Sequence, residues 1–192
     1  MPLLTVGHGA LSRAELLALL IGADVESVVD VRRFPGSRRN PDVGRDALAS
    51  WLPAAGIGYR WEENLGGRRH LTKAAQARSP DTWWQVAAFR AYAGYTRSEE
   101  FGAALTRVVQ EARTARVAVM CSESVWWRCH RRIIADLTAL TTDVPVAHLM
   151  HDGAVRAHTP SEGARTREDG LVWDVAGSVD APSRTDEDGA HR

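Results

Sequence analysis

The chain has 192 residues, enough for one hydrophobic core of ordinary size and too few for two comfortable domains. Hydrophobic residues make up 44% and charged residues 25% of the composition, which excludes a disordered chain. The formal net charge is zero, but because segment 151–192 is acidic, residues 1–150 are mildly basic. No apolar run reaches the roughly 18 residues of a membrane span, and no signal-peptide pattern begins the chain. Two cysteines are too few for a disulfide scaffold. We therefore expect a cytoplasmic protein with no membrane partner.

The first 31 residues predict a strand, a helix and a second strand. Leu3-Leu-Thr-Val-Gly7 is short, apolar and β-branched, and Ser12-Arg-Ala-Glu15 has the spacing of a capping box for a helix that ends near Gly22. Ser27-Val-Val-Asp-Val31 is typical of a buried strand. Because such βαβ units have parallel strands, the carboxyl ends of both strands open on the same edge of the sheet. Three polar residues are expected at that edge: His8, Asp30 and Arg32.

The same alternation continues to about residue 150. After an arginine-rich loop the pattern predicts helices over 45–55, 81–95, 98–112 and 129–137, with a second capping box at 96–99, and strands over 57–61, 116–121 and 144–149. We therefore expect a single Rossmann-like α/β domain over 1–150, with a mainly parallel sheet of about five strands flanked by helices. Residues 151–192 predict a polar, acidic, partly disordered tail, in which the apolar segment 171–175 can dock as an edge strand or a lid.

Polar residues follow most of the predicted strands. Ligands bind outside the carboxyl ends of the strands in open α/β sheets, because helix N-termini there present unpaired N–H groups. Each polar residue alone fits an ordinary structural role, but their gathering at one edge favours a functional site. They are His8, Asp30, Arg32, Cys121, Glu123 and His148.

The segment from Cys121 to Arg131 carries the strongest local signal. It combines two thiols, an acid, an imidazole and guanidinium groups in a connection from strand to helix, which is typical of anion binding. A helix N-terminus and nearby arginines lower a thiol pKa, so Cys121 or Cys129 is a candidate nucleophile, with inert packing as the alternative for Cys121. Six residues separate Cys121 from Arg128, one more than a phosphatase loop requires.

Other chemistries for this segment have weaker support. Paired close-spaced zinc motifs are absent, so we expect no metal, while zinc held by cysteines and histidines and a redox thiol pair remain alternatives. The arginine loop 32–39 suits phosphate contacts or a solvated surface. Trp126-Trp127 suits stacking on a nucleobase, covering the site or plugging the core, whereas Trp83-Trp84 is expected to pack within a helix.

Several short motifs also occur in order along the chain. They are Thr5-Val-Gly-His8, Asp30-Val-Arg32 with Pro35 and Ser37, Leu65-Gly-Gly67, Met120-Cys121 with Glu123, and Cys129-His-Arg131. In this set, over about residues 3–150, the chain resembles the domain-of-unknown-function 488 family. The resemblance implies an α/β fold and a pocket built from these positions, but it brings no reaction. Gly9 stands where many relatives have a serine, so the resemblance implies no serine-based role at this position.

These observations favour an enzyme that acts on a phosphorylated or otherwise anionic substrate, such as a nucleotide or nucleic acid, as a cysteine-dependent hydrolase or transferase. A non-catalytic module that binds or senses nucleotides or nucleic acid is the alternative. The sequence names no cofactor and no oligomeric state. The expected catalytic residues are Cys121 as nucleophile, His8 or His130 as proton carrier, and Glu123 as orienting group or base. The expected substrate-binding residues are Asp30, Arg32, Cys129 and Arg131.

Overall fold

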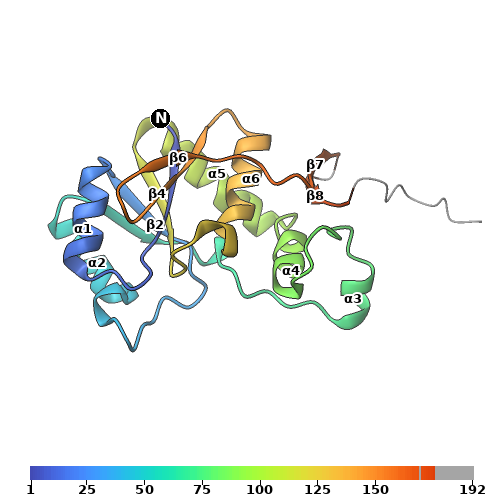
Figure 1. The fold of residues 1–192 in the computed structure, drawn as a ribbon, viewed down its shortest axis with the longest axis horizontal. Coiled ribbons are helices and arrows are strands. Elements are labelled where there is room, and N and C mark those ends of the chain that lie inside the picture. The colour runs from blue at the N-terminus through green and yellow to red at the C-terminus, as the bar shows by residue number, and fades with distance from the viewer. Residues whose placement is uncertain (169, 176–192) are drawn as a thin grey trace, which may run out of the picture.

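A six-stranded, mainly parallel β-sheet forms the scaffold of the protein in a computed structural model that describes residues 1–168 and 170–175 (Figure 1). The strand order is β3-β2-β4-β1-β5-β6, and all neighbours are parallel except β5 and β6. The predicted α/β fold is therefore confirmed, with one strand more than expected. The strands are β1 (Leu3–Gly7), β2 (Ser27–Asp30), β3 (Gly58–Trp61), β4 (Val117–Cys121), β5 (Val146–Leu149) and β6 (Val155–Ala157).

Helices cover both faces of this sheet. On one face α1 and α2 bury leucines against β1, β2 and β4, and on the other α4, α5 and α6 enclose a larger core (Figure 1). The capping box predicted for α1 is present, because the Ser12 hydroxyl accepts from the Glu15 N–H and the Glu15 carboxylate accepts from the Ser12 N–H. The helices are α1 (Arg13–Gly22), α2 (Arg45–Ala54), α3 (Lys73–Ala77), α4 (Ala87–Tyr95), α5 (Glu99–Thr114) and α6 (Arg131–Thr141).

One predicted helix begins too early, and one predicted capping box is wrong. The helix expected from residue 81 starts only at Ala87, because the backbone N–H of Trp83 is taken by the carbonyl of Trp173, far away in the chain. Trp83 and Trp84 still pack against the core, but from an irregular segment. The second capping box is also wrong: Thr96 ends α4, and Ser98 caps α5 through the N–H of Phe101.

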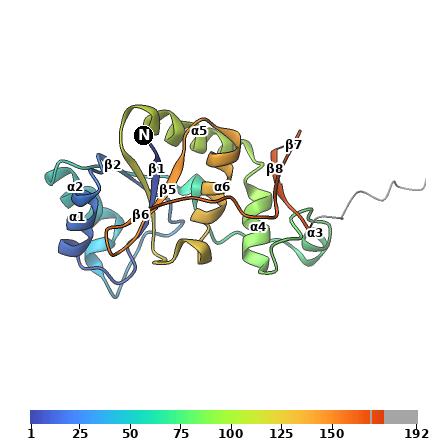
Figure 2. The same cartoon turned by 45° about the horizontal axis from the view of Figure 1, so that its top comes forward.

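The segment after residue 151 adds three strands. β6 extends the main sheet, whereas β7 (Ala164–Arg167) and β8 (Gly170–Trp173) form a separate antiparallel pair that packs against α4 and α6 (Figure 2). The apolar segment 171–175 thus contributes a strand to this pair and none to the main sheet. The part of the predicted tail from 176 to 192 lies outside the described residues. None of the helices in the described part of the chain combines the length and apolar character that a membrane crossing requires.

Candidate functional site

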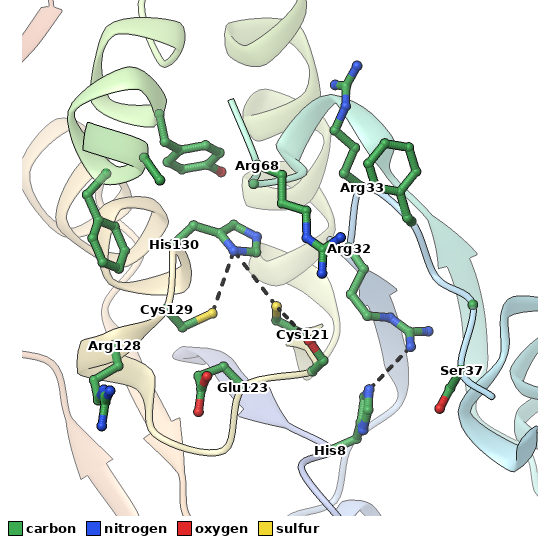
Figure 3. Close-up of a pocket in the computed structure, with 17 residues that line it drawn as sticks. His8, Arg32, Arg33, Ser37, Arg68, Cys121, Glu123, Arg128, Cys129 and His130 are labelled. Atoms are coloured by element: carbon green, nitrogen blue, oxygen red, sulfur yellow. Dashed lines mark hydrogen bonds between the residues drawn. The ribbon is translucent and has the colours of Figure 1, made fainter. Parts of the chain in front are cut away.

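A cavity of about 300 Å³ opens at the carboxyl ends of β1, β2 and β4 (Figure 3). His8 directly follows β1, Arg32 lies just after β2, and Cys121 ends β4; the side chains of all three line the cavity. The backbone N–H of His8 donates to the carbonyl of Cys121 at 2.9 Å, so these two residues are neighbours. The cleft that the sequence predicted at this edge is therefore present, and it brings His8 and Cys121 together.

His130 lies between the two cysteines of the site. Its Nδ1 is 3.8 Å from the sulfur of Cys121 and 3.6 Å from that of Cys129, as the dashed lines of Figure 3 show. Its Nε2 is 3.0 Å from the carbonyl oxygen of Val31. A carbonyl only accepts, so Nε2 carries the hydrogen and the lone pair of the neutral ring, at Nδ1, faces the sulfurs. A side chain at Gly67 would come within 2.9 Å of Nδ1, which explains the glycine there.

The environments of the two thiols differ. A hydrogen bond from Cys129 lowers the pKa of Cys121 well below its ordinary value; burial opposes this, while His130 and the backbone N–H of Glu123 favour it. Burial raises the pKa of Cys129 well above its ordinary value, and its hydrogen bond to Cys121 acts in the same direction. Cys121 is therefore the thiol that ionises first, and Cys129 keeps its proton and donates.

Asp30, Arg32 and His8 form one buried chain of contacts. Asp30 is fully buried and accepts from Arg32 Nε at 2.8 Å and Nη2 at 2.5 Å, and from the Tyr59 hydroxyl at 3.0 Å. Arg32 Nη1 in turn donates to His8 Nε2 at 3.2 Å, while His8 Nδ1 donates to the Gly9 carbonyl at 3.0 Å. Asp30 does not line the cavity but orients Arg32, which does.

Among these contacting side chains, the positive charge lies on the guanidinium group of Arg32. Burial and the neighbouring Arg32 lower the pKa of His8, so its ring is neutral and its Nε2 serves as an acceptor. Burial also opposes the charge on Arg32, yet the hydrogen bonds and charge of Asp30 prevail and raise the pKa of Arg32 above its ordinary value. Burial, with the Asp30 carboxylate, raises the pKa of Tyr59, which therefore stays a neutral donor. The result is a fixed cation at the cavity wall.

Arg131 lies beneath the cavity and not in its wall. Only 1% of its surface is exposed, and it donates to the backbone carbonyl of Glu123 and, at 3.4 Å, to the sulfur of Cys129. It thus holds the 122–128 loop, whereas the side chain of Glu123 lines the cavity (Figure 3). A side chain at Gly7 would collide with the Glu123 carbonyl and the Arg131 guanidinium, so this approach requires glycine.

Several cavity residues were missed by the sequence reasoning. Arg68 and Arg128 join Arg32 and Arg33, so four arginines and one acid, Glu123, line the cavity. The other side is aromatic and comes from α4 and the arginine loop, whose members Arg38 and Arg39 do not line it. No local signal marks these aromatic residues as site residues, because two belong to a helix predicted by its apolar spacing and one to a loop noted only for its arginines. They are Phe34, Phe89 and Tyr92.

His148 faces away from this cavity. It is 1% exposed, its Nδ1 lies 2.7 Å from the Thr5 hydroxyl, its Nε2 lies 2.9 Å from His158, and Trp126 stacks on it at 3.8 Å. Burial lowers its pKa to about 3, so it is neutral. His148 therefore belongs to a buried series of hydrogen-bonded side chains, and Trp126 covers this series. Trp127 is 47% exposed and does not line the cavity.

Among the described residues, one group of side chains comes close enough together to hold a metal ion. The ligand atoms of Cys121, Cys129 and His130 lie within 4.8 Å of one another. Two thiolates and an imidazole are a donor set that zinc accepts, and with three protein ligands such an ion would keep an open fourth position.

The fold and the cavity together define an α/β protein with a cysteine–histidine site at the carboxyl edge of its sheet. The family model described as domain of unknown function DUF488 matches residues 12–138, about two thirds of the chain, and the chain belongs to this family. The match contains the Cys121–Arg131 segment but begins after His8 and ends before β5. Comparisons with curated proteins and with solved structures give no match.

Proposed function

We propose that the protein is a cysteine-dependent hydrolase or transferase that acts on a phosphorylated or otherwise anionic substrate. One observation carries this proposal: the sulfur of Cys121 faces the lone pair of His130 Nδ1 inside a cavity lined by four arginines. A thiol beside an imidazole that can take its proton is the arrangement of an activated nucleophile. The arginines supply the positive charge that an anionic substrate requires.

The chemistry follows from these contacts. Cys121 attacks the electrophilic centre of the substrate, and His130 holds the thiol proton on Nδ1 and delivers it to the leaving group. The carbonyl of Val31 fixes the ring for this transfer, since it occupies the opposite nitrogen. Water then releases the substrate fragment from Cys121 in a hydrolase, and a second acceptor does so in a transferase. The carboxylate of Glu123, in the cavity wall, activates that water or acceptor.

His8 has a positioning role in this scheme. Its Nε2 is occupied by Arg32, so it is not free to exchange a proton with substrate. Arg32 uses Nε and Nη2 for Asp30 and one N–H of Nη1 for His8, which leaves the second N–H of Nη1 for an anionic oxygen in the cavity. The arginine is thus held in place before substrate binds, and this reduces the entropy that binding costs.

Nucleotides and related phosphate esters fit the composition of the wall best. Phe34, Phe89 and Tyr92 offer apolar and aromatic surface next to the arginines, as a planar base with an attached phosphate requires. The volume is at the lower end of the range for small-molecule sites, which favours one monomeric unit over a long polymer. The two neighbouring thiols are unpaired, and a reducing compartment such as the cytoplasm keeps them so.

The test is turnover of a panel of nucleoside phosphates, phosphodiesters and simple phosphate esters by the full chain. We expect Cys121→Ala to lower kcat by about 10³-fold or more while the melting temperature stays within a few degrees. Thr106→Ala, on the exposed side of α5, is the matched control and should be fully active. Rapid quenching should trap a fragment on Cys121. Full activity of Cys121→Ala would reject the thiol mechanism; salt-sensitive binding of a nucleotide without any product would instead favour the non-catalytic module.

A further inference from the structure

We propose that Cys129 is a resolving thiol, so that oxidation of Cys121 by a peroxide ends in a reversible Cys121–Cys129 disulfide. This inference rests on the proposed function in one respect, namely that Cys121 is the reactive thiol of the cavity. It gives Cys129 a role that the hydrolytic or transfer chemistry does not use. It also makes the site sensitive to oxidants.

The geometry of the two sulfurs supports this step. Both contact the same atom, His130 Nδ1, and both lie within 4.8 Å of it and of one another. Both cysteines are nearly buried, at 6% and 4% exposure, yet both line the cavity and are open to a molecule as small as hydrogen peroxide. The chain has no third cysteine that could compete.

The elements on which the cysteines lie favour an internal bond. Cys121 ends β4 and Cys129 directly precedes the N-terminal turn of α6, so the two are joined by a loop of seven residues. Arg131 holds the two ends of this loop together, since it donates both to the carbonyl of Glu123 and to the sulfur of Cys129. A disulfide requires the sulfurs to approach to about 2 Å, a movement confined to this loop and the two side chains.

The reaction balances with hydrogen peroxide as the only oxidant. The Cys121 thiolate attacks one peroxide oxygen, the O–O bond breaks, and Cys121 becomes a sulfenic acid. The other oxygen leaves as hydroxide and becomes water with the proton that His130 Nδ1 took from Cys121, so that the imidazole is neutral again. Cys129 then loses its proton to His130 Nδ1 and attacks the Cys121 sulfur. The S–S bond forms, the S–O bond breaks, and the hydroxide that leaves takes the proton from His130. Two thiols and one peroxide give one disulfide and two waters.

The consequence is protection of the nucleophile. A sulfenic acid without a neighbouring thiol is oxidised further to sulfinic acid, which most cells cannot reverse, whereas a disulfide is restored by any dithiol reductant. Oxidised protein should therefore lose its turnover and regain it on reduction.

The experiment treats the reduced full chain with one equivalent of hydrogen peroxide, then blocks free thiols with N-ethylmaleimide under denaturing conditions and measures the intact mass. We expect the chain to lose two hydrogens and take up no maleimide, and to accept two maleimides after dithiothreitol. In the Cys129→Ser variant, Cys121 should instead gain oxygen. After one equivalent of peroxide the product should be a sulfenic acid that dimedone captures, and in excess peroxide it should be a sulfinic acid. Cys121→Ser should leave Cys129 reduced.

The wild-type measurement decides the matter even if a variant fails to fold. Sulfinic acid at Cys121 with Cys129 still free would overturn the inference, as would a disulfide between two chains. A native protein whose Cys121 reacts with iodoacetamide but forms no disulfide retains the proposed function and loses only this inference. A Cys121 that reacts with neither reagent refutes both.

Discussion

Asp30→Asn tests the arrangement on which Arg32 depends. The Asp30 side chain is fully buried, that of Arg32 is 6% exposed, and the carboxylate accepts from Arg32 Nε, Arg32 Nη2, the Arg32 backbone N–H and the Tyr59 hydroxyl. An amide removes the compensating charge and turns one acceptor into a donor that faces another donor. Breaking a buried pair on one side costs about 3–5 kcal/mol, because the remaining charge has no partner.

The assay is urea unfolding at pH 7.5, followed by circular dichroism and by tryptophan fluorescence. For a chain of this size, a decrease of about 3–5 kcal/mol in the unfolding free energy corresponds to a fall in melting temperature of roughly 10 °C. Asp46→Asn is the matched control, since Asp46 also pairs with an arginine but its side chain is 93% exposed, and its unfolding free energy should not change. If Asp30→Asn unfolds at the same urea concentration as this control, the buried Asp30–Arg32 pair does not exist as described, and the fixed cation of the cavity loses its basis.

Three further measurements follow from the structure. Burial lowers the pKa of His148 to about 3, so below pH 6.5 the unfolded chain binds more protons than the folded chain. The unfolding free energy should therefore fall with decreasing pH, by up to about 1.4 kcal/mol per pH unit. His148→Gln should flatten this pH dependence in urea titrations at pH 7.5 and 5. Gly67→Ala should displace His130 and slow alkylation of the Cys121 thiol by about 10²-fold at unchanged melting temperature, and an unchanged rate would contradict the role proposed for the His130 imidazole. Arg68→Ala should raise KM about tenfold with little change in kcat, while Arg38→Ala, from an arginine outside the cavity wall, should not.

The sheet and the edge at which the cavity opens could be predicted because their signals are local. Short β-branched runs such as 27–31 and 116–121 alternate with helical spacing, and the parallel topology then fixes which strand ends meet. His8, Arg32 and Cys121 could be placed at one edge on this basis, before any distance was known. The expectation needed only the positions of polar residues at strand ends.

Side-chain direction and long-range contacts could not be predicted in this way. Arg131 begins α6 beside the cavity, but its side chain turns beneath the loop to the Glu123 carbonyl, and nothing in a sequence pattern states that direction. Tyr92 lines the cavity because α4 packs next to the loop of Leu65, whose carbonyl accepts from the Tyr92 hydroxyl at 2.6 Å. That contact joins segments 27 residues apart in the chain. His148 fits the pattern of a site residue equally well, yet it is enclosed by its neighbours.

The carboxylate of Asp136 connects the α6 helix to the last described strands. It is fully buried and accepts from the His158 ring at 2.8 Å, the Ser161 backbone N–H at 2.9 Å and the Trp173 indole at 2.7 Å. All three donors lie beyond residue 138, where the family match stops. Without the segment that follows residue 138, the buried carboxylate of Asp136 would therefore lose all three of these donors.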